Sequence, residues 1–303
     1  MLSAAVDSQR IPCTMTLMRN WLQAIRGRGP ATRAEPAATG PRRSTLRDPV
    51  LQRQFADVGF VVVDLIDPAT VLALRKRYDS MDHEQRTQFD WVDGFNTSIY
   101  DKRPEYRAEV FDLMQEHISP ALASVLNDYQ IMFANFIVKD PHSDMVPPHV
   151  DWTFLDEEQF SSATVWCPLV DTTPANGTLG VVSGSHRRIN FLRPSNVPTY
   201  ERCELAVADI EDRPVISLRA GQAIVMDNRV VHFSPPNTTD LDRVAVGCVV
   251  GPTEAELHHY WMNEDSELMR YQIDRSFYLD FVIGSPPMQS SGVLSASVVS
   301  HGV

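Results

Sequence analysis

The sequence predicts an α+β fold, mainly β, with flanking helices and a core that is a small antiparallel barrel or a double-sheet jelly roll. Helical patterns come first, and many short strand patterns broken by Pro, Gly and Asn follow from residue 131 onward. The chain has 303 residues, of which 43% are hydrophobic and 22% charged, as in a globular enzyme with one large domain or two small ones.

Each element follows from a local pattern. Asp57-Val58-Gly59-Phe60 followed by three valines predicts the end of a helix, a turn and a buried strand. Apolar residues at helical spacing predict one helix over residues 68–81 and a second over residues 105–126. The strand patterns lie at residues 131–138, 163–169, 180–182, 215–218, 223–226 and 244–250. An acidic, helix-like patch precedes His258 and His259, which are therefore expected on the surface.

The ends of the chain differ in composition from its middle. Residues 1–47 carry many arginines and almost no acids, which predicts a disordered or leader segment. An organellar transit peptide is an alternative, because such peptides are rich in Arg and poor in acids. A start codon placed too early, with the native chain beginning at Met15 or Met18, is another. The sequence thus predicts one domain over residues 48–283 and a disordered tail over residues 284–303, which is rich in Ser, Gly, Pro and Val.

Charge and cysteine content exclude several classes of protein. The net charge of −12 disfavours a nucleic-acid-binding face, and no apolar run reaches the roughly 18–20 residues of a membrane-spanning helix. The cysteines are far apart and form no Cys-x-x-Cys pair, which favours a reducing cytoplasm over a zinc site or a disulfide framework. We therefore expect a cytoplasmic protein that binds small molecules, and the oligomeric state stays open.

A His-x-Asp motif occurs twice, at His142-Ser143-Asp144 and at His149-Val150-Asp151. Residues i and i+2 of a strand point to the same face, so such a pair can converge on one metal ion. The first motif lies between prolines in a turn-like stretch, whereas the second opens a strand-like run over residues 150–154. The sequence therefore favours His149 and Asp151 as ligands of a metal that takes two His and one carboxylate.

The third ligand is expected to be His232, although His186, His258 and His259 are also candidates. His232 ends an apolar run at the rim of a predicted strand, where a lone His is more often a buried core residue. Ser234 and Arg243 follow His232 in the sequence, and they favour a metal ligand over a buried core residue at this position. Arg243 leads into a buried-looking strand, and its planar guanidinium can bind a carboxylate through two hydrogen bonds, to which the Ser234 hydroxyl can add one. The non-functional alternative for Arg243 is a surface ion pair with Asp240 or Asp242.

These features, in this order, resemble the phytanoyl-CoA dioxygenase family of Fe(II)- and 2-oxoglutarate-dependent oxygenases. The resemblance covers about residues 50–283. The segments that carry it are Asp57–Val63, His149-Val150-Asp151, Trp166, Asn176-Gly177 through Ser185-His186, Gly221-Gln222-Ala223, His232, Ser234 and Arg243. It implies a double-stranded β-helix and a dioxygenase that hydroxylates a small-molecule or acyl-type metabolite, using Fe(II), O2 and 2-oxoglutarate and releasing succinate and CO2.

The resemblance also implies roles for single residues. By position, His149, Asp151 and His232 correspond to the catalytic iron ligands, and Arg243 and Ser234 to the anchors of the 2-oxoglutarate C5 carboxylate. Trp166 corresponds to a residue that packs along the co-substrate, with Thr164 on the same face. Asn135 is expected to contact the co-substrate, in competition with Lys139 on the same face. Related halogenases lack the carboxylate that Asp151 supplies, so hydroxylation is favoured over halogenation.

The substrate stays open. Residues 194–214 are expected to form an insertion over the barrel mouth, and Arg187, Arg188 and Arg193 are the nearby basic residues that a CoA phosphate would need. Two rival functions remain: a β-helix that binds a metabolite without turning it over, and a cupin-type metalloenzyme that uses no 2-oxoglutarate. Arg243 argues against the cupin, and the full set of ligands and anchors argues against the silent binder.

Overall fold

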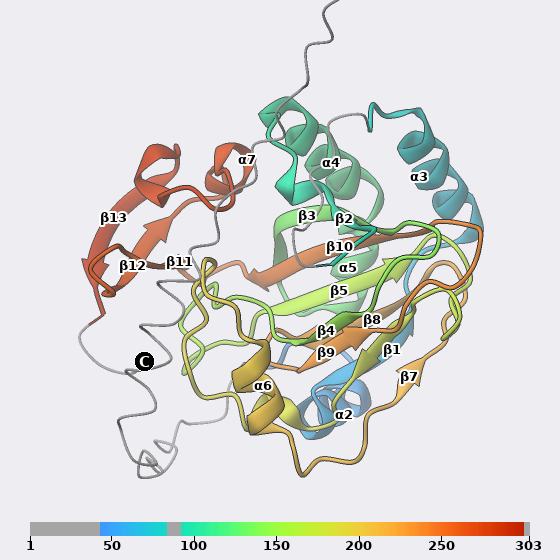
Figure 1. Ribbon diagram of the computed structural model, residues 1–303, viewed down its shortest axis with the longest axis horizontal. Coiled ribbons are helices and arrows are strands. Elements are labelled where there is room, and N and C mark those ends of the chain that lie inside the picture. Colours follow the sequence, from blue (N-terminus) through green and yellow to red (C-terminus); the bar gives the residue numbers. More distant parts are fainter. Residues whose placement is uncertain (1–42, 84–91, 300–303) are drawn as a thin grey trace, which may run out of the picture. The chain divides into compact units, whose positions relative to one another are not determined.

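The computed structural model describes residues 43–83 and 92–299, and the predicted leader lies mostly outside them. Within this part, six antiparallel strands form a major sheet in the order β1-β8-β5-β10-β3-β2, and four form a minor sheet in the order β4-β9-β6-β7. The two sheets make the double-stranded β-helix that the sequence predicts (Figure 1). A third sheet, β11-β12-β13, completes the described chain.

The α-helices have 4 to 14 residues each, and short 3-10 turns accompany them. They are α2 (Pro49–Val58), α3 (Pro68–Ser80), α4 (Pro104–His117), α5 (Ser119–Val125), α6 (Tyr200–Ala206), α7 (Phe277–Asp280) and the 3-10 turns η1 (Ser98–Tyr100), η2 (Ser185–Arg187) and η3 (Pro287–Gln289). The strands are β1 (Phe60–Asp64), β2 (Phe95–Thr97), β3 (Tyr129–Lys139), β4 (Val146–His149), β5 (Ala163–Pro168), β6 (Leu179–Val181), β7 (Val215–Ile216), β8 (Gln222–Asp227), β9 (His232–Ser234), β10 (Arg243–Pro252), β11 (Leu257–Met262), β12 (Leu268–Ile273) and β13 (Val293–Val298).

The first helix and strand show how local sequence sets an element. Asp48 caps α2 by accepting hydrogen bonds from the backbone N–H groups of Val50 and Leu51. Gly59 ends the helix with φ of +89°, a left-handed conformation that favours glycine. Its missing side chain is also required, because a Cβ there would lie 2.5 Å from His186 Nδ1. The chain then enters β1, as predicted.

The two faces of the major sheet carry different contacts. Alternate side chains of β3, β5, β8 and β10 point outward and pack against helices α3, α4 and α5 in the largest hydrophobic cluster. The opposite set points inward, where Trp166, Ile224 and Ala245 pack against Leu179 and Val181 of the minor sheet. The candidate site residues lie on this inner face and on the facing strands β4 and β9.

Several expectations differ from the structure. The helix predicted over residues 105–126 is two helices, because Ser119-Pro120 begins a new one and proline cannot donate the backbone hydrogen bond that would continue α4. His258 and His259 lie in β11 and are buried, not on a surface, since β12 pairs with that strand and the aromatic cluster around Phe277 covers it.

The predicted disorder of the tail is also wrong for the residues before 300. Residues 293–298 form β13 and pair with β12 through the backbone, although nearly all their side chains are exposed. Composition does not reveal such a strand, because its hydrogen bonds depend only on main-chain groups. At the other end, Thr45 and Leu46 are already buried, so the domain begins a few residues before the predicted boundary.

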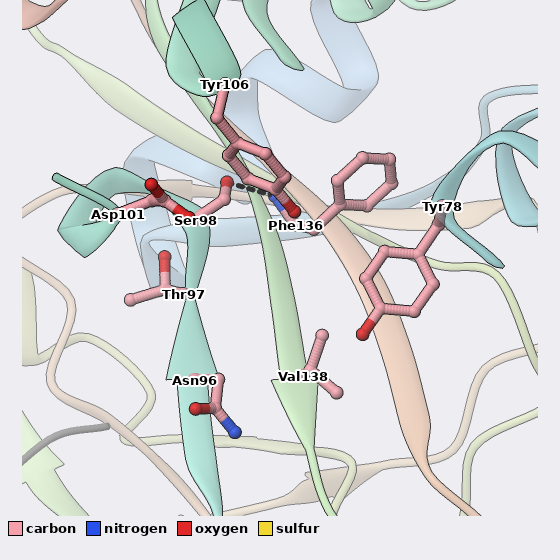
Figure 2. Close-up of a pocket in the computed structure, with 8 residues that line it drawn as sticks. All are labelled: Tyr78, Asn96, Thr97, Ser98, Asp101, Tyr106, Phe136 and Val138. Carbon is pink, nitrogen blue, oxygen red and sulfur yellow. Dashed lines mark hydrogen bonds between the residues drawn. The ribbon is translucent and has the colours of Figure 1, made fainter. Parts of the chain in front are cut away.

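A small cavity lies on the outer side of β3, away from the inner face. Figure 2 shows it between Tyr78, Tyr106, Phe136 and the β2 residues, with Ser98 Oγ accepting a hydrogen bond from the Phe136 backbone N–H. Phe136 and Val138 alternate with Asn135, Ile137 and Lys139, so the sheet separates this cavity from the candidate site. In the part of the chain that the structure describes, no helix is long and apolar enough to cross a membrane.

Candidate active site

Three predicted ligands meet at one place. The ligand atoms of His149, Asp151 and His232 all lie within 4.8 Å of one another. His149 ends β4 and His232 begins β9, and the two are directly paired across these strands, with ring centroids 4.2 Å apart. Residues 150–154 form no regular strand, contrary to expectation. Cross-strand pairing of the two histidines, with Asp151 in the segment after β4, therefore builds the cluster.

The histidine rings are held in the tautomer that a metal ligand needs. His149 Nδ1 lies 2.8 Å from the Pro147 carbonyl, and His232 Nδ1 lies 3.0 Å from the Val230 carbonyl. A carbonyl only accepts hydrogen bonds, so each Nδ1 carries the proton and each Nε2 presents a lone pair toward the cluster. Burial, and then the nearness of His232, lower the pKa of His149 to about 4, which favours the neutral ring.

Asp151 is oriented by a hydroxyl from the major sheet. Thr164 Oγ1 donates a 2.5 Å hydrogen bond to Asp151 Oδ2, while Asp151 Oδ1 lies 3.9 Å from His232 Nε2. One carboxylate oxygen is thus engaged by protein and the other faces the histidines. Thr164 was predicted to line the co-substrate, but its hydroxyl contacts the ligand carboxylate. Asn228 Oδ1 lies 3.0 Å from the same hydroxyl, so it is a second acceptor within reach of the one Thr164 hydroxyl hydrogen.

The first His-x-Asp motif takes no part in this cluster. His142 has φ of +56°, a turn conformation, and its Nε2 pairs with Asp240 at 2.9 Å on the surface. Asp144 is also exposed. The preference for the second motif agrees with this geometry.

Deeper on the inner face lies a buried cationic group. Arg243 begins β10 and is 1% exposed, and its guanidinium carbon lies 5.2 Å from the centre of the Trp166 ring. Its Nη1 donates to the Ile137 carbonyl at 3.1 Å, but its Nε has no hydrogen-bond partner in residues 43–83 and 92–299. Burial lowers the pKa of Arg243 to about 9. The alternative of a surface ion pair is therefore wrong: Asp242 pairs with Arg75 and Asp240 with His142.

The other predicted co-substrate residues lie on the same side of the major sheet or on the facing strand β9. Asn135 and Trp166 flank Gly247 of β10 on either side, and the buried Oδ1 of Asn135 has no partner. Ser234 is buried too, but its hydroxyl already donates to the Gly177 carbonyl at 2.8 Å. Unpartnered buried polar atoms are rare in folded proteins, so those of Arg243 and Asn135 indicate that a polar ligand completes the site.

Comparisons with known proteins identify the family. The sequence profile described as phytanoyl-CoA dioxygenase (PhyH) matches residues 55–245, which include the triad and Arg243. The chain belongs to the phytanoyl-CoA dioxygenase family. It is 29% identical over 132 residues to phytanoyl-CoA dioxygenase 1 of Oryza sativa, a match that spans 39% of this chain and 43% of that protein. Phytanoyl-CoA dioxygenase domain-containing protein 1 of Danio rerio is 27% identical over 248 residues, which span 63% and 85%. The chain thus matches less than half of the rice relative.

Solved structures share the fold of this chain. The non-haem alpha-ketoglutarate-dependent carbocyclase SnoK of nogalamycin biosynthesis superposes with a TM-score of 0.55 at 21% identity, covering 72% of this chain and 90% of that one. EctD of S. alaskensis, solved with 2-oxoglutarate and 5-hydroxyectoine, superposes with a TM-score of 0.50 at 18% identity, covering 76% and 81%. At these identities the likeness concerns the fold.

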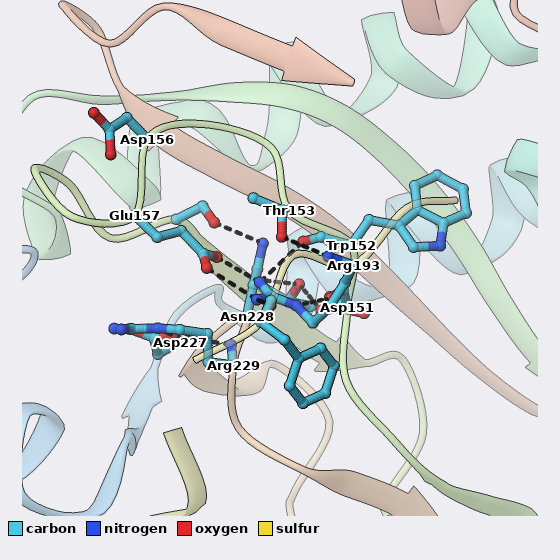
Figure 3. A network of polar contacts seen from close by, with 12 residues as sticks. Asp151, Trp152, Thr153, Asp156, Glu157, Arg193, Asp227, Asn228 and Arg229 are labelled. Atoms are coloured by element: carbon cyan, nitrogen blue, oxygen red, sulfur yellow. Dashed lines mark hydrogen bonds and ion pairs between the residues drawn. The ribbon is translucent and has the colours of Figure 1, made fainter. Parts of the chain in front are cut away.

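Within the family fold, a buried ion pair braces the segment that carries Asp151. Arg193 is fully buried; its Nε donates to the Asp151 carbonyl at 2.7 Å and its Nη2 to the Trp152 carbonyl at 3.4 Å (Figure 3). The same guanidinium pairs with both carboxylate oxygens of Glu157. The Arg193 carbonyl also accepts a hydrogen bond from the Thr153 N–H. The sequence analysis did not predict these contacts of Arg193, because no local sequence pattern indicates them.

Residues 195–207, which follow Arg193, pack against other parts of the domain. Val207, at the end of α6, packs with Val150 and Val231, which neighbour the histidine ligands. Ser195 Oγ lies 2.8 Å from His259 Nε2, and its backbone N–H donates to Tyr260. The predicted insertion over the barrel mouth therefore bridges the ligand strands and β11.

Proposed function

We propose that this chain is an Fe(II)- and 2-oxoglutarate-dependent dioxygenase that hydroxylates a small-molecule metabolite with release of succinate and CO2. The observation that carries the proposal is the combination of a complete His149–Asp151–His232 cluster with a buried Arg243 on the inner face of the major sheet, whose Nε has no hydrogen-bond partner among the described residues. Two imidazoles and one carboxylate fit ferrous iron and leave other coordination positions open. A buried guanidinium with a free Nε fits a carboxylate. Membership of the family supports both assignments.

The residues of the chain have distinct tasks in this proposal. His149, Asp151 and His232 hold the metal, which supplies the redox chemistry that activates O2. The Nδ1 hydrogen bonds of the two histidines and the Thr164 hydroxyl fix the direction of the three donor groups. Arg243 binds the C5 carboxylate of 2-oxoglutarate, with Trp166 beside it and Asn135 available as an acceptor or donor. Asp151 occupies the position whose loss would open a site for chloride, which favours hydroxylation.

The charged contacts favour a small molecule over a CoA thioester. A CoA substrate needs free cations for its phosphates. Of the three arginines considered for that role, Arg187 pairs with Asp57, Arg188 pairs with Asp209, and Arg193 is buried against Glu157. An acyl-type substrate on another carrier remains compatible with these contacts. The carbon that is oxidised and the identity of the metabolite stay open.

Binding and turnover separate this proposal from its two rivals. Calorimetry of the Fe(II)-loaded protein without O2 is expected to show 2-oxoglutarate binding that Arg243→Ala weakens and His142→Ala leaves unchanged. With O2 and a panel of metabolites, one substrate is expected to couple succinate release to its own hydroxylation. A cupin-type enzyme would not bind 2-oxoglutarate, and a silent binder would bind it without releasing succinate. Either result would refute the proposal.

A further inference from the structure

A second buried cation lies beside Arg243. Lys139, at the end of β3, is 0% exposed and is the direct cross-strand partner of Arg243 in the pairing of β3 with β10. Directly opposed residues of an antiparallel pair point to the same face with Cβ atoms about 5 Å apart, and like charges there are unfavourable. In residues 43–83 and 92–299, neither cation forms an ion pair with a carboxylate.

The Lys139 amine donates two hydrogen bonds. Two are enough for a neutral amine, whereas a charged ammonium would have one hydrogen left without an acceptor. Its Nζ donates to the backbone carbonyls of Pro235 and Ser234. Gly177 packs so closely against the side chain that a Cβ there would lie 2.7 Å from Lys139 Cδ. Burial, and then the charge of Arg243, lower the pKa of Lys139 to about 7, while the exposed Asp144 acts in the opposite sense. Two buried cations without an anion are costly, and removing one or adding an anion relieves that cost.

We propose that Lys139 is a second cationic anchor, beside Arg243, for the distal carboxylate of 2-oxoglutarate. The inference rests on the proposed function and extends it by a residue. Ser234, the expected second anchor, has its only hydroxyl hydrogen donated to Gly177. Lys139 has a third ammonium hydrogen beyond the two that it donates to carbonyls, and its charge matches the ligand. The carboxylate becomes the counter-ion that both buried cations lack.

This arrangement couples co-substrate binding to proton uptake. In the free protein Lys139 loses its proton as the pH rises through about 7, whereas a bound carboxylate favours the charged form. Below that pH Lys139 is charged in both states, and the affinity does not change with its titration. Above it, each ligand bound takes up a proton, so the affinity falls by up to about tenfold per pH unit. The charged groups that act on Lys139 are Arg243 from β10 and Asp144 from the turn after β3.

The test is calorimetric and needs no turnover. The Fe(II)-loaded protein is titrated without O2 between about pH 6 and about pH 8.5, in buffers of different ionisation enthalpy, with 2-oxoglutarate and with 2-oxopentanoate. The second ligand keeps the chelating end but lacks the distal carboxylate. Lys139→Gln keeps an N–H donor for the two carbonyls and removes the charge. Lys76→Gln, at an exposed position of α3, is the matched control.

We expect Lys139→Gln to weaken 2-oxoglutarate binding about ten- to a hundredfold, as for the loss of a hydrogen bond between charged groups. Binding of 2-oxopentanoate should not change. The proton uptake that begins near pH 7 in the wild type should be lost, leaving only the uptake by Arg243 that begins toward pH 9. An equal loss for both ligands would make Lys139 a merely structural residue and overturn the inference. So would wild-type binding without proton uptake, a measurement that stands even if the variant fails to fold. A wild type that binds no 2-oxoglutarate would instead refute the proposed function itself.

Discussion

Replacing Arg243 should move fold stability and co-substrate affinity in opposite directions. The guanidinium is 1% exposed, and its Nε has no partner. Burial lowers its pKa from the ordinary value of 12.5 to about 9. Since one pKa unit corresponds to about 1.4 kcal/mol, keeping this group charged costs the folded state on the order of 5 kcal/mol without a ligand. A cation whose folded-state pKa is lowered destabilises the fold at every pH below the unfolded pKa, and fully so below about 9.

Arg243→Met removes the charge and keeps most of the volume. We expect the unliganded protein to gain about 1–4 kcal/mol in free energy of unfolding, the range seen when buried charges are replaced by apolar groups. The same change leaves the C5 carboxylate of 2-oxoglutarate without its main partner, a loss on the order of 3–5 kcal/mol, or roughly 10²- to 10³-fold or more in the KM for 2-oxoglutarate. Arg243→Lys keeps a charge but loses the two-pronged geometry, so its KM should lie between those of the wild type and Met.

The assay pairs urea unfolding of the unliganded protein with succinate release measured against 2-oxoglutarate concentration. Arg53→Met, at an exposed position of α2, controls for the loss of any arginine. Fe(II) affinity should change little in all variants, because among the described residues no hydrogen bond or ion pair joins Arg243 to any of the three ligands. A destabilised Arg243→Met protein with a wild-type KM would show that the guanidinium serves the fold and not the co-substrate, and would remove the main support for the 2-oxoglutarate assignment.

Three further predictions concern the metal centre. His149→Ala should abolish Fe(II) binding measured by metal analysis, while His142→Ala should leave it intact; the reverse would mean that the metal site is misassigned. Thr164→Val removes the hydroxyl that orients Asp151 and should weaken Fe(II) binding by about 10- to 100-fold, the usual range for a partner of a metal ligand, and wild-type affinity would contradict that role. Arg193→Met leaves the Glu157 carboxylate, whose side chain is only 15% exposed, without its partner and frees the Asp151 carbonyl. It should cost about 3–5 kcal/mol of unfolding free energy by denaturant titration, whereas a cost under about 1 kcal/mol would refute the brace.

Much of the candidate site could be predicted because the types of its residues and their order along the chain indicate its chemistry. A His-x-Asp pair, a later His and an Arg eleven residues on are rare together, and the apolar run after Arg243 already argued for burial. The strand patterns from residue 131 onward correspond to β3, β5, β6, β7, β8 and β10. These features are local, and alternating or helical periodicity records them directly.

The failures share one cause, which is that a partner far along the chain decides the outcome. His259 is buried in a strand rather than exposed on the surface because β12 pairs with that strand. Residues 293–298 are ordered because they pair with the other edge of β12. The hydrogen bond from Thr164 to Asp151 was likewise not predicted, since it forms only because β5 passes beside the segment after β4. No periodicity within either segment contains that information.

The sequence by itself therefore determined the donor groups, their order and the general fold, because side-chain chemistry and hydrophobic periodicity are properties of short segments. Only the tertiary structure decided which groups touch. Arg243 and Lys139 are 104 positions apart and meet because β3 and β10 pair in one particular register. A shift of one residue would send either side chain to the opposite face of the sheet. Register is set by packing of the whole barrel, so the pairing of two buried cations became visible only in the folded chain.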